Sequence, residues 1–262
     1  MPIPKTYTTE AIVLKKMKLG EADSILTMYT CNFGKLKAVA KGERRPKSKL
    51  GGHVESLVYS KMSLARGRNL DIVTQVQTIE GFMPLRHDLW RISYALYIAE
   101  LTNKFTAEEI ESYPTFNLLH NVLSWLCTTN NAKIALRYFE MHLLTYSGYC
   151  PELHRCLNCN NELQPITNYF SPRVGGVLCP QCRDYGLGTK PISVDALKVL
   201  RFVQKTDCLQ ADRLKINPGL SFELEQIMEH YIEHLLGEQI NSTRWLDRLR
   251  IELPVQQKER GY

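Results

Sequence analysis

The chain has 262 residues, of which 44% are hydrophobic and 23% are charged. This is the composition of a globular protein, and it excludes disordered, collagen-like and coiled-coil chains. No run of 18 apolar residues and no apolar signal core near the N-terminus occurs, so we expect a soluble, cytoplasmic protein that does not bind membranes.

The net charge of +6 is distributed unevenly along the chain. Residues 1–80 contain 14 Lys or Arg against 7 Asp or Glu, and the remaining residues contain 19 against 20. The excess positive charge therefore lies entirely in the first third. This asymmetry indicates a segment that binds a polyanion, joined to an ordinary domain.

Residues 8 to 80 are expected to form about five short strands. The β-rich runs are separated by turn sequences such as Leu19-Gly20-Glu21 and Gly67-Arg68-Asn69. So many closely spaced strands in so short a segment predict a small closed or partly open barrel. The alternative is a curved antiparallel sheet that packs on the following domain.

A run of cations lies within this strand region, opposed only by Glu43. It comprises Lys35, Lys37, Lys41, Arg44, Arg45, Lys47 and Lys49. Such a run repels itself unless a polyanion neutralises it, so we predict that these residues bind the phosphates of a nucleic acid. Arg66 and Arg68 are expected to extend the patch, and Lys15, Lys16 and Lys18 are further candidates. The alternative is a solubilising surface loop.

Stacking of bases would require aromatic side chains among these cations. Tyr29, Phe33 and Tyr59 are the candidates in the strand region. A place in the hydrophobic core is the favoured interpretation for each of them.

From Phe82-Met83-Pro84 onward, apolar residues recur at helical spacing. Helices are predicted over residues 89–105, 116–129 and 133–148, and the last has Gly148 as its C-terminal cap. The first helix should be largely buried, with one apolar stripe and further apolar residues on the adjacent faces. The stripe comprises Leu89, Ile92, Leu96 and Ala99, and the adjacent faces hold Trp90, Tyr94, Tyr97 and Leu101.

Two further helices are predicted after a cysteine-rich segment. Ser193 is suited to cap the first, over residues 193–206, and Ser221 to cap the second, over residues 222–240. The second cap would place Glu223 and Glu225 in the first helical turn, where the helix dipole favours carboxylates.

Four of the eight cysteines form two C-x-x-C pairs, Cys156/Cys159 and Cys179/Cys182, with 19 residues between the pairs. This spacing is typical of a zinc ribbon, in which four thiolates hold one metal ion tetrahedrally. We predict one structural Zn²⁺ per chain, with Gly175-Gly176 at the turn of a short hairpin. Reduced thiols without metal and a redox-active pair are the alternatives.

No catalytic motif stands out in the sequence. Phosphate-binding loops, dinucleotide-binding glycine motifs, nucleophile elbows and zinc-protease motifs do not occur. We therefore assign no catalytic residue and expect no enzyme. A metal-dependent site built from Glu21, Asp23 and a histidine is the remaining enzymatic alternative.

The N-terminal block combines a strand with Val13-Leu14, a turn with Gly20-Glu21-Ala22-Asp23, Thr30 and Gly34 before the next strand, and Ala40-Lys41-Gly42 running into the basic stretch. With these features it resembles the RecO family of bacterial DNA repair proteins. The cysteine quartet within a helical half also fits this family, so the resemblance covers essentially the whole chain.

The resemblance implies an α+β multidomain fold. An N-terminal OB-fold barrel would occupy residues 1–80, and an all-α helical domain would occupy residues 81–262. A zinc-ribbon-like element would be embedded in the helical domain at about residues 150–190. The basic stretch from Lys35 to Lys49 matches the DNA-binding face of the family's OB-fold.

The resemblance also implies a function. Members of the family bind single- and double-stranded DNA and anneal complementary strands coated by single-strand DNA-binding protein (SSB), whose C-terminal tail they bind. With RecR they promote loading of RecA, and they are not enzymes. The implied location is the cytoplasm, with nucleoid association when bound to DNA. A zinc-ribbon scaffold that binds RNA or ribosomes is the alternative function.

Overall fold

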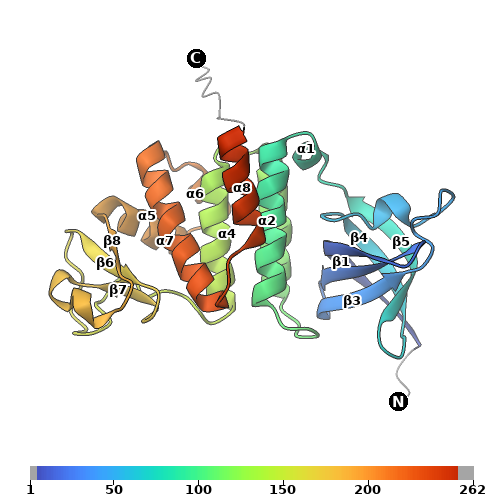
Figure 1. The fold of residues 1–262 in the computed structure, drawn as a ribbon, viewed down its shortest axis with the longest axis horizontal. Helices are drawn as coiled ribbons and strands as arrows, with labels where there is room; N and C mark the ends of the chain where they lie inside the picture. The colour runs from blue at the N-terminus through green and yellow to red at the C-terminus, as the bar shows by residue number, and fades with distance from the viewer. Residues whose placement is uncertain (1–4, 253–262) are drawn as a thin grey trace.

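The computed structural model describes residues 5–252, and the first part of this range forms a closed five-stranded barrel (Figure 1). The order around the barrel is β1-β2-β3-β5-β4, in which only the β3–β5 pair is parallel. The strands are β1 (Thr6–Leu19), β2 (Asp23–Thr30), β3 (Gly34–Ala40), β4 (Tyr59–Ala65) and β5 (Asp71–Glu80). The predicted barrel is confirmed, and the curved open sheet is not observed.

The barrel closes because apolar side chains alternate along its strands. Inward-facing residues such as Val13, Met28 and Leu64 form a core cluster confined to the barrel. Tyr29 and Ile12, by contrast, belong to a second and larger cluster that includes the helices. The barrel therefore has an interior core of its own and a separate apolar surface toward the helical domain.

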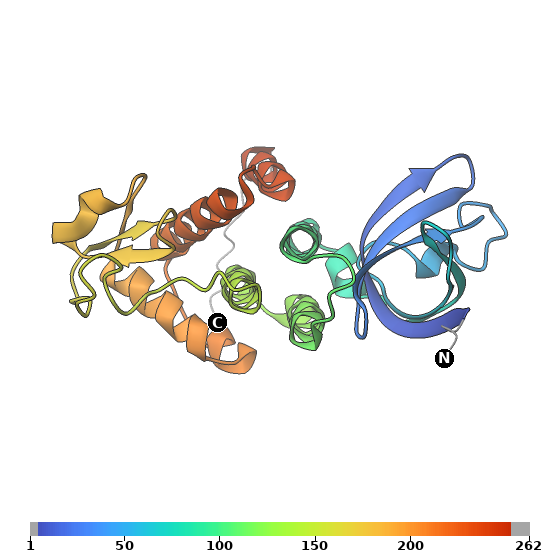
Figure 2. The same ribbon diagram turned by 90° about the horizontal axis from the view of Figure 1, so that it is seen from below.

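A helical domain follows, with α2 and α4 at the middle of the long axis of the molecule and the barrel at one end (Figures 1 and 2). Its helices are α1 (Met83–Arg86), α2 (Leu89–Phe105), α3 (Tyr113–Thr128), α4 (Ala132–Tyr146), α5 (Val194–Lys205), α6 (Cys208–Asp212), α7 (Pro218–Leu236) and α8 (Asn241–Glu252). No helix among the described residues combines the length and apolar character that a bilayer crossing requires.

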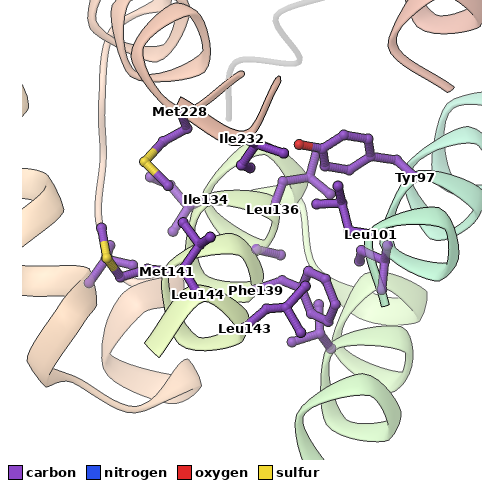
Figure 3. Packing of buried hydrophobic residues seen from close by; sticks show 14 of the residues in the cluster. Tyr97, Leu101, Ile134, Leu136, Phe139, Met141, Leu143, Leu144, Met228 and Ile232 are labelled. Carbon is purple, nitrogen blue, oxygen red and sulfur yellow. The ribbon is translucent and has the colours of Figure 1, made fainter. Parts of the chain in front are cut away.

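Helix α4 is the centre of the helical packing (Figure 3). Its side chains Ile134, Phe139 and Leu143 are almost completely buried, and they pack between residues of α2 and α7 such as Tyr97 and Met228. A helix buried on several sides at once stabilises the domain through apolar area removed from water, about 25 cal/mol per Å².

The cysteine-rich segment forms a small three-stranded sheet at the end of the molecule opposite the barrel (Figure 1). Its strands are β6 (Asn168–Ser171), β7 (Gly176–Leu178) and β8 (Lys190–Ile192), and two 3-10 turns, η1 (Gly51–His53) in the barrel and η2 (Pro180–Tyr185) here, complete the fold. Gly175, with φ of 78°, lies in the turn between β6 and β7. The predicted glycine hairpin is therefore present.

The predicted buried stripe of helix 89–105 is wrong in part. Leu89 and Leu96 are 45% and 40% exposed, whereas Tyr97 and Leu101 are buried. The helix is apolar around most of its circumference, so its sequence period does not select one face. The packing of α4 and α8 decides which side is covered.

The predicted cap at Ser221 is also wrong, because α7 already begins at Pro218 and Asn217 is its cap. An Asn cap followed by proline at the first helical position is a strong start signal, which explains the earlier beginning. Glu223 instead accepts hydrogen bonds from Ser193 N and Oγ, at 2.6 and 2.8 Å. Ser193 itself caps α5 as predicted, accepting from Ala196 N.

Candidate nucleic-acid interface and metal centre

The loop Lys41–Lys49, here called the basic loop, is held against the β1–β2 turn. Gly42 N donates to Asp23 Oδ1 at 2.7 Å, and Arg44 N donates to Ala22 O at 3.0 Å. Arg44 Nη1 also donates to Gly20 O at 3.2 Å. Two segments about twenty residues apart are therefore fixed side by side.

Glu43 anchors the basic loop from inside. Its side chain is only 2% exposed, and it accepts hydrogen bonds from Ser24 Oγ at 2.5 Å and Lys16 Nζ at 3.0 Å. Lys16 Nζ also contacts Glu55 Oε1 at 2.7 Å. Although burial opposes the charged ammonium, the bonds to Glu55 and Glu43 raise the pKa of Lys16 above its ordinary value.

Most of the predicted nucleic-acid-binding residues are exposed. The exposed residues are Lys41, Arg44, Arg45, Lys47, Lys49, Arg66 and Arg68. None of these seven side chains forms an ion pair with a carboxylate within residues 5–252. Arg66, in the β4–β5 hairpin, lies over the ring of Tyr7 with its guanidinium carbon 4.9 Å from the ring centre. These guanidinium and ammonium groups are free to contact an anion.

Lys35 and Lys37 have partners within the protein. Lys35 is 9% exposed, and its Nζ donates to Asn103 O at 2.6 Å. Burial lowers the pKa of Lys35, while Lys37 Nζ pairs with the carboxylate of Glu108. The sequence placed both on one strand face, and the structure adds that the connection between α2 and α3 pairs with the start of this strand. Lys37 remains 44% exposed.

The three aromatic candidates for base stacking have structural roles. Tyr29 is 1% exposed, and the hydroxyl of Tyr59 donates to Glu10 while its ring packs on Phe116 of α3. Phe33 meets Tyr7 edge-on with ring centres 4.8 Å apart. The core interpretation is therefore confirmed for Tyr29, and Tyr59 joins the barrel to the helices.

Lys61 of β4 was not singled out by the sequence, because no other charged residue lies within four positions of it. The structure places it on the outer surface of the barrel, exposed, in a groove that also contains Lys49. The alternation of the strand could have predicted that Lys61 faces outward, but the sequence could not predict its neighbours from β1, β5 and the basic loop.

The four cysteines converge on one point. Their Sγ atoms all lie within 4.8 Å of one another, and Cys159 Sγ and Cys179 Sγ are 3.9 Å apart. Thiolates bound to zinc at about 2.3 Å in a tetrahedron lie about 3.8 Å apart, so the spacing fits a metal ion. Cys150 lies outside this group, and its Sγ accepts from Gln204 Nε2 at 3.0 Å.

Amide donors surround the cysteine sulfurs. Cys179 N points to Cys156 Sγ at 3.4 Å, and Asn158 Nδ2 lies 3.2 Å from Cys182 Sγ. Burial alone would raise the pKa of Cys156, but the neighbouring N–H groups outweigh it and lower the pKa to about 6. Burial raises the pKa of Cys179 to about 12, so the amide donors favour the thiolate, the form that binds a metal, at Cys156.

The cysteines are also the only group of three or more His, Cys, Asp or Glu side chains, among residues 5–252, placed closely enough to hold a metal. Glu21 and Asp23 therefore do not meet a histidine in such a cluster, and Asp23 instead binds the backbone of the basic loop. The hypothesis of a metal-dependent enzyme at these residues has no geometric support.

Comparison with known sequences covers both domains. The profile described as "Recombination protein O N terminal" matches residues 3–82, and that described as "Recombination protein O C terminal" matches residues 86–244. A DNA repair protein RecO from Dehalococcoides mccartyi is 44% identical over 249 residues, covering 95% of this chain and 98% of the relative.

More distant relatives carry the same name. The DNA repair protein RecO of Roseiflexus is 38% identical over 94% of this chain and 87% of its own length. That of Desulforamulus reducens is 35% identical over 94% of this chain and 95% of its own length. With a barrel, a helical domain and the cysteine quartet in the expected order, the chain belongs to the RecO family of DNA repair proteins.

Proposed function

We propose that the protein is a recombination mediator that acts by binding DNA, without making or breaking covalent bonds. It binds single- and double-stranded DNA, anneals complementary strands coated by SSB, and with RecR promotes loading of RecA. SSB is contacted through its C-terminal tail, and RecA is reached indirectly. Membership of the RecO family supports this proposal, and so does the exposed, unpaired charge of the basic loop.

The proposed division of labour follows the charge distribution. The barrel, residues 1–80, contacts DNA, whereas the helical domain, residues 81–262, contacts the protein partners. We propose that the protein works in the cytoplasm and is associated with the nucleoid when bound to DNA.

The exposed cations provide a physical mechanism for annealing. Two strands of like charge repel, and a surface of Lys and Arg side chains lowers this repulsion by displacing counterions. The cations of the basic loop are point charges on a polar loop, with Tyr29 and Tyr59 engaged elsewhere. Contacts of this kind go to phosphates, so they leave the bases free to pair.

We also propose that the four cysteines hold one structural Zn²⁺ per chain. Four sulfur donors within 4.8 Å of one another match the preference of zinc. Four protein ligands leave no open coordination position, so the ion would stabilise the fold and would not activate a substrate. Cys156, Cys159, Cys179 and Cys182 are the ligands.

Charge reversal in the basic loop tests the proposed DNA contact. The triple variant Arg44→Glu, Arg45→Glu, Lys47→Glu should lose annealing of SSB-coated strands, because six units of charge change at the proposed phosphate contacts. Its thermal unfolding should match that of the unmodified protein, since all three side chains are exposed.

A matched variant carries the same charge change on the helical domain, with Lys133→Glu, Arg213→Glu and Lys215→Glu, which are also exposed. It should retain binding to naked DNA. Unchanged annealing by the basic-loop variant would refute the assignment of the loop. A preference for RNA over DNA in competition binding would favour a scaffold protein of RNA or ribosomes.

A further inference from the structure

The side of the barrel next to β3 is lined in part by carboxylates of the protein itself. Small barrels of this class commonly bind oligonucleotides on the face of their second and third strands. Here the segment Glu108–Glu111, named the acidic segment, lies against β3. Glu109 N donates to Lys35 O at 3.0 Å, and the carboxylate of Glu108 pairs with Lys37.

The acidic segment packs closely against the barrel. A Cβ atom added to Gly34 would lie 2.0 Å from Ile110 O, so the backbones of the two segments are in direct contact. Glu109 has φ of 59°, a left-handed conformation that non-glycine residues seldom adopt. A hollow of about 640 Å³ remains beside β3, but Asp71, Glu108, Glu109 and Glu111 belong to its lining. A DNA strand in this hollow would meet four carboxylates, which repel its phosphates.

A different face of the barrel carries a second groove. A groove of about 530 Å³ runs over β1, β4 and β5, and one end of the basic loop forms its wall. The polar side chains that line it include Thr8, Lys49, Lys61, Ser63, Gln75 and Gln77. These side chains are hydrogen-bond donors or cations, which are the groups that contact phosphate and sugar in DNA complexes.

The charge of this groove differs from that of the β3 face. No carboxylate lines the groove, and Lys49 and Lys61 have no ion-pair partner among the residues that the structure describes. The carboxylate next to it is that of Glu10, opposite Lys61 on β1, and it is engaged by the hydroxyl of Tyr59. The groove therefore continues the positive surface of the basic loop onto the strands.

We propose that one DNA strand crosses the barrel along this groove, with Lys49 and Lys61 at phosphates and Ser63, Gln75 and Gln77 along the backbone. The proposal rests on the proposed function, since it assumes that the protein binds DNA, and it adds the face that does so. No aromatic side chain lines the groove, so the strand is held by its backbone and its bases face outward, where a complementary strand can pair.

The test compares single substitutions in the full chain, with binding of a fluorescent oligodeoxythymidine of about 16 nucleotides followed by anisotropy at several salt concentrations. Lys61→Gln should weaken binding roughly tenfold and reduce the slope of log affinity against log salt by about 0.7, the value for one phosphate on a single strand. Lys37→Gln removes the same charge from β3 and should change neither quantity.

A substitution that strengthens DNA binding provides a second test, because a misfolded variant would not be expected to bind DNA more tightly. Gln75→Lys adds a cation to the groove and should strengthen binding and steepen the salt slope, whereas Gln181→Lys adds the same charge near the cysteines and should not.

The outcomes separate the two proposals. If Lys37→Gln weakens binding and Lys61→Gln does not, the strand uses the side of the barrel next to β3 and the groove assignment is wrong. If the unmodified protein binds but no groove variant changes its affinity, the groove is wrong while DNA binding stands. If the unmodified protein does not bind the oligonucleotide, the proposed function itself fails.

Discussion

Glu43 is the one acidic residue in the cationic run from Lys35 to Lys49, and it is among the most buried charged side chains of the barrel. From the sequence alone, its carboxylate would be expected to repel an anionic ligand that binds to this run. The structure gives it another role, because its carboxylate ties the basic loop to Ser24 and Lys16. Its negative charge is therefore directed toward Ser24 and Lys16 inside the protein and does not face a ligand.

Removal of this anchor should therefore weaken DNA binding, although it makes the protein more positive. Glu43→Gln loses charged hydrogen bonds worth about 1–3 kcal/mol of folding stability, and the freed loop must be ordered again when DNA binds. We expect affinity for single-stranded DNA to fall several-fold in anisotropy titrations.

Glu55→Gln is the control for this prediction. It removes the other carboxylate of Lys16, but this side chain is 49% exposed and lies outside the basic loop. Its effect on affinity should be zero or slightly favourable. Affinity that rises in Glu43→Gln would show that net charge outweighs the position of the loop.

At the scale of secondary structure, Glu100 of α2 holds the start of α8. Its two carboxylate oxygens accept from Asn241 N at 3.0 Å, Ser242 N at 2.8 Å and Ser242 Oγ at 2.7 Å. Burial by itself would raise the pKa of Glu100, but these hydrogen bonds outweigh it and hold the pKa below its ordinary value of 4.5. A carboxylate at the first N–H groups of a helix supplies its missing acceptors.

The lowered pKa predicts how this contact depends on pH. Because the folded-state value lies below the unfolded one, the stabilisation is complete above about pH 4.5 and is lost as the pH falls below it. Glu100→Gln should reduce the free energy of unfolding by about 1 kcal/mol at pH 7. This difference from the unmodified protein should shrink toward pH 3 in denaturant titrations.

Glu238→Gln serves as the comparison, since this side chain is 62% exposed and pairs with Lys104 outside the cap. It should cost little at either pH. A constant deficit of Glu100→Gln across the pH range would mean that the loss comes from packing and not from the charged cap.

The elements that could be predicted from the sequence are those whose signals are local. Alternating strands, glycine turns, the Ser193 cap and the C-x-x-C spacing all lie within a few residues of one another, and the barrel, helices and cysteine cluster follow from them. The buried side of α2 and the cover over Lys35 depend on contacts with residues far along the chain. No pattern within one segment contains that information, so these features required the structure.

At the scale of the whole molecule, one apolar cluster connects the barrel with the cysteine segment. It extends from Ile12 and Tyr29 through the helices to Cys156, Phe170 and Val177. The interior of the barrel is a separate cluster. The cysteine cluster is therefore tied to the stability of the helical domain, whereas the proposed DNA surface depends on the barrel.

Metal removal should separate these two properties. We expect about one equivalent of zinc per purified chain by elemental analysis, and chelation or Cys179→Ser should lower the Tm by destabilising the helical domain. Binding of naked DNA should persist in the metal-free protein at temperatures where the barrel remains folded.

Cys150→Ser is the control for the metal prediction, because this sulfur lies outside the cluster and accepts from Gln204. Its zinc content should stay at one equivalent. A chain that purifies without metal and has the same Tm with and without added zinc would contradict the structural zinc site.

The acidic segment also completes a sheet edge. Strand β3 pairs with β5 only at Ala38 and Val39, and the bridge from Lys35 to Glu108 covers part of the remaining edge. Unpaired edges invite association with other chains. Because residues 108–111 are synthesised after all five strands, a growing chain exposes this edge until the α2–α3 connection has emerged. All five strands of the barrel have thus been synthesised once the chain reaches residue 80. The uncovered part of the β3 edge is protected only some thirty residues later, when the acidic segment is present.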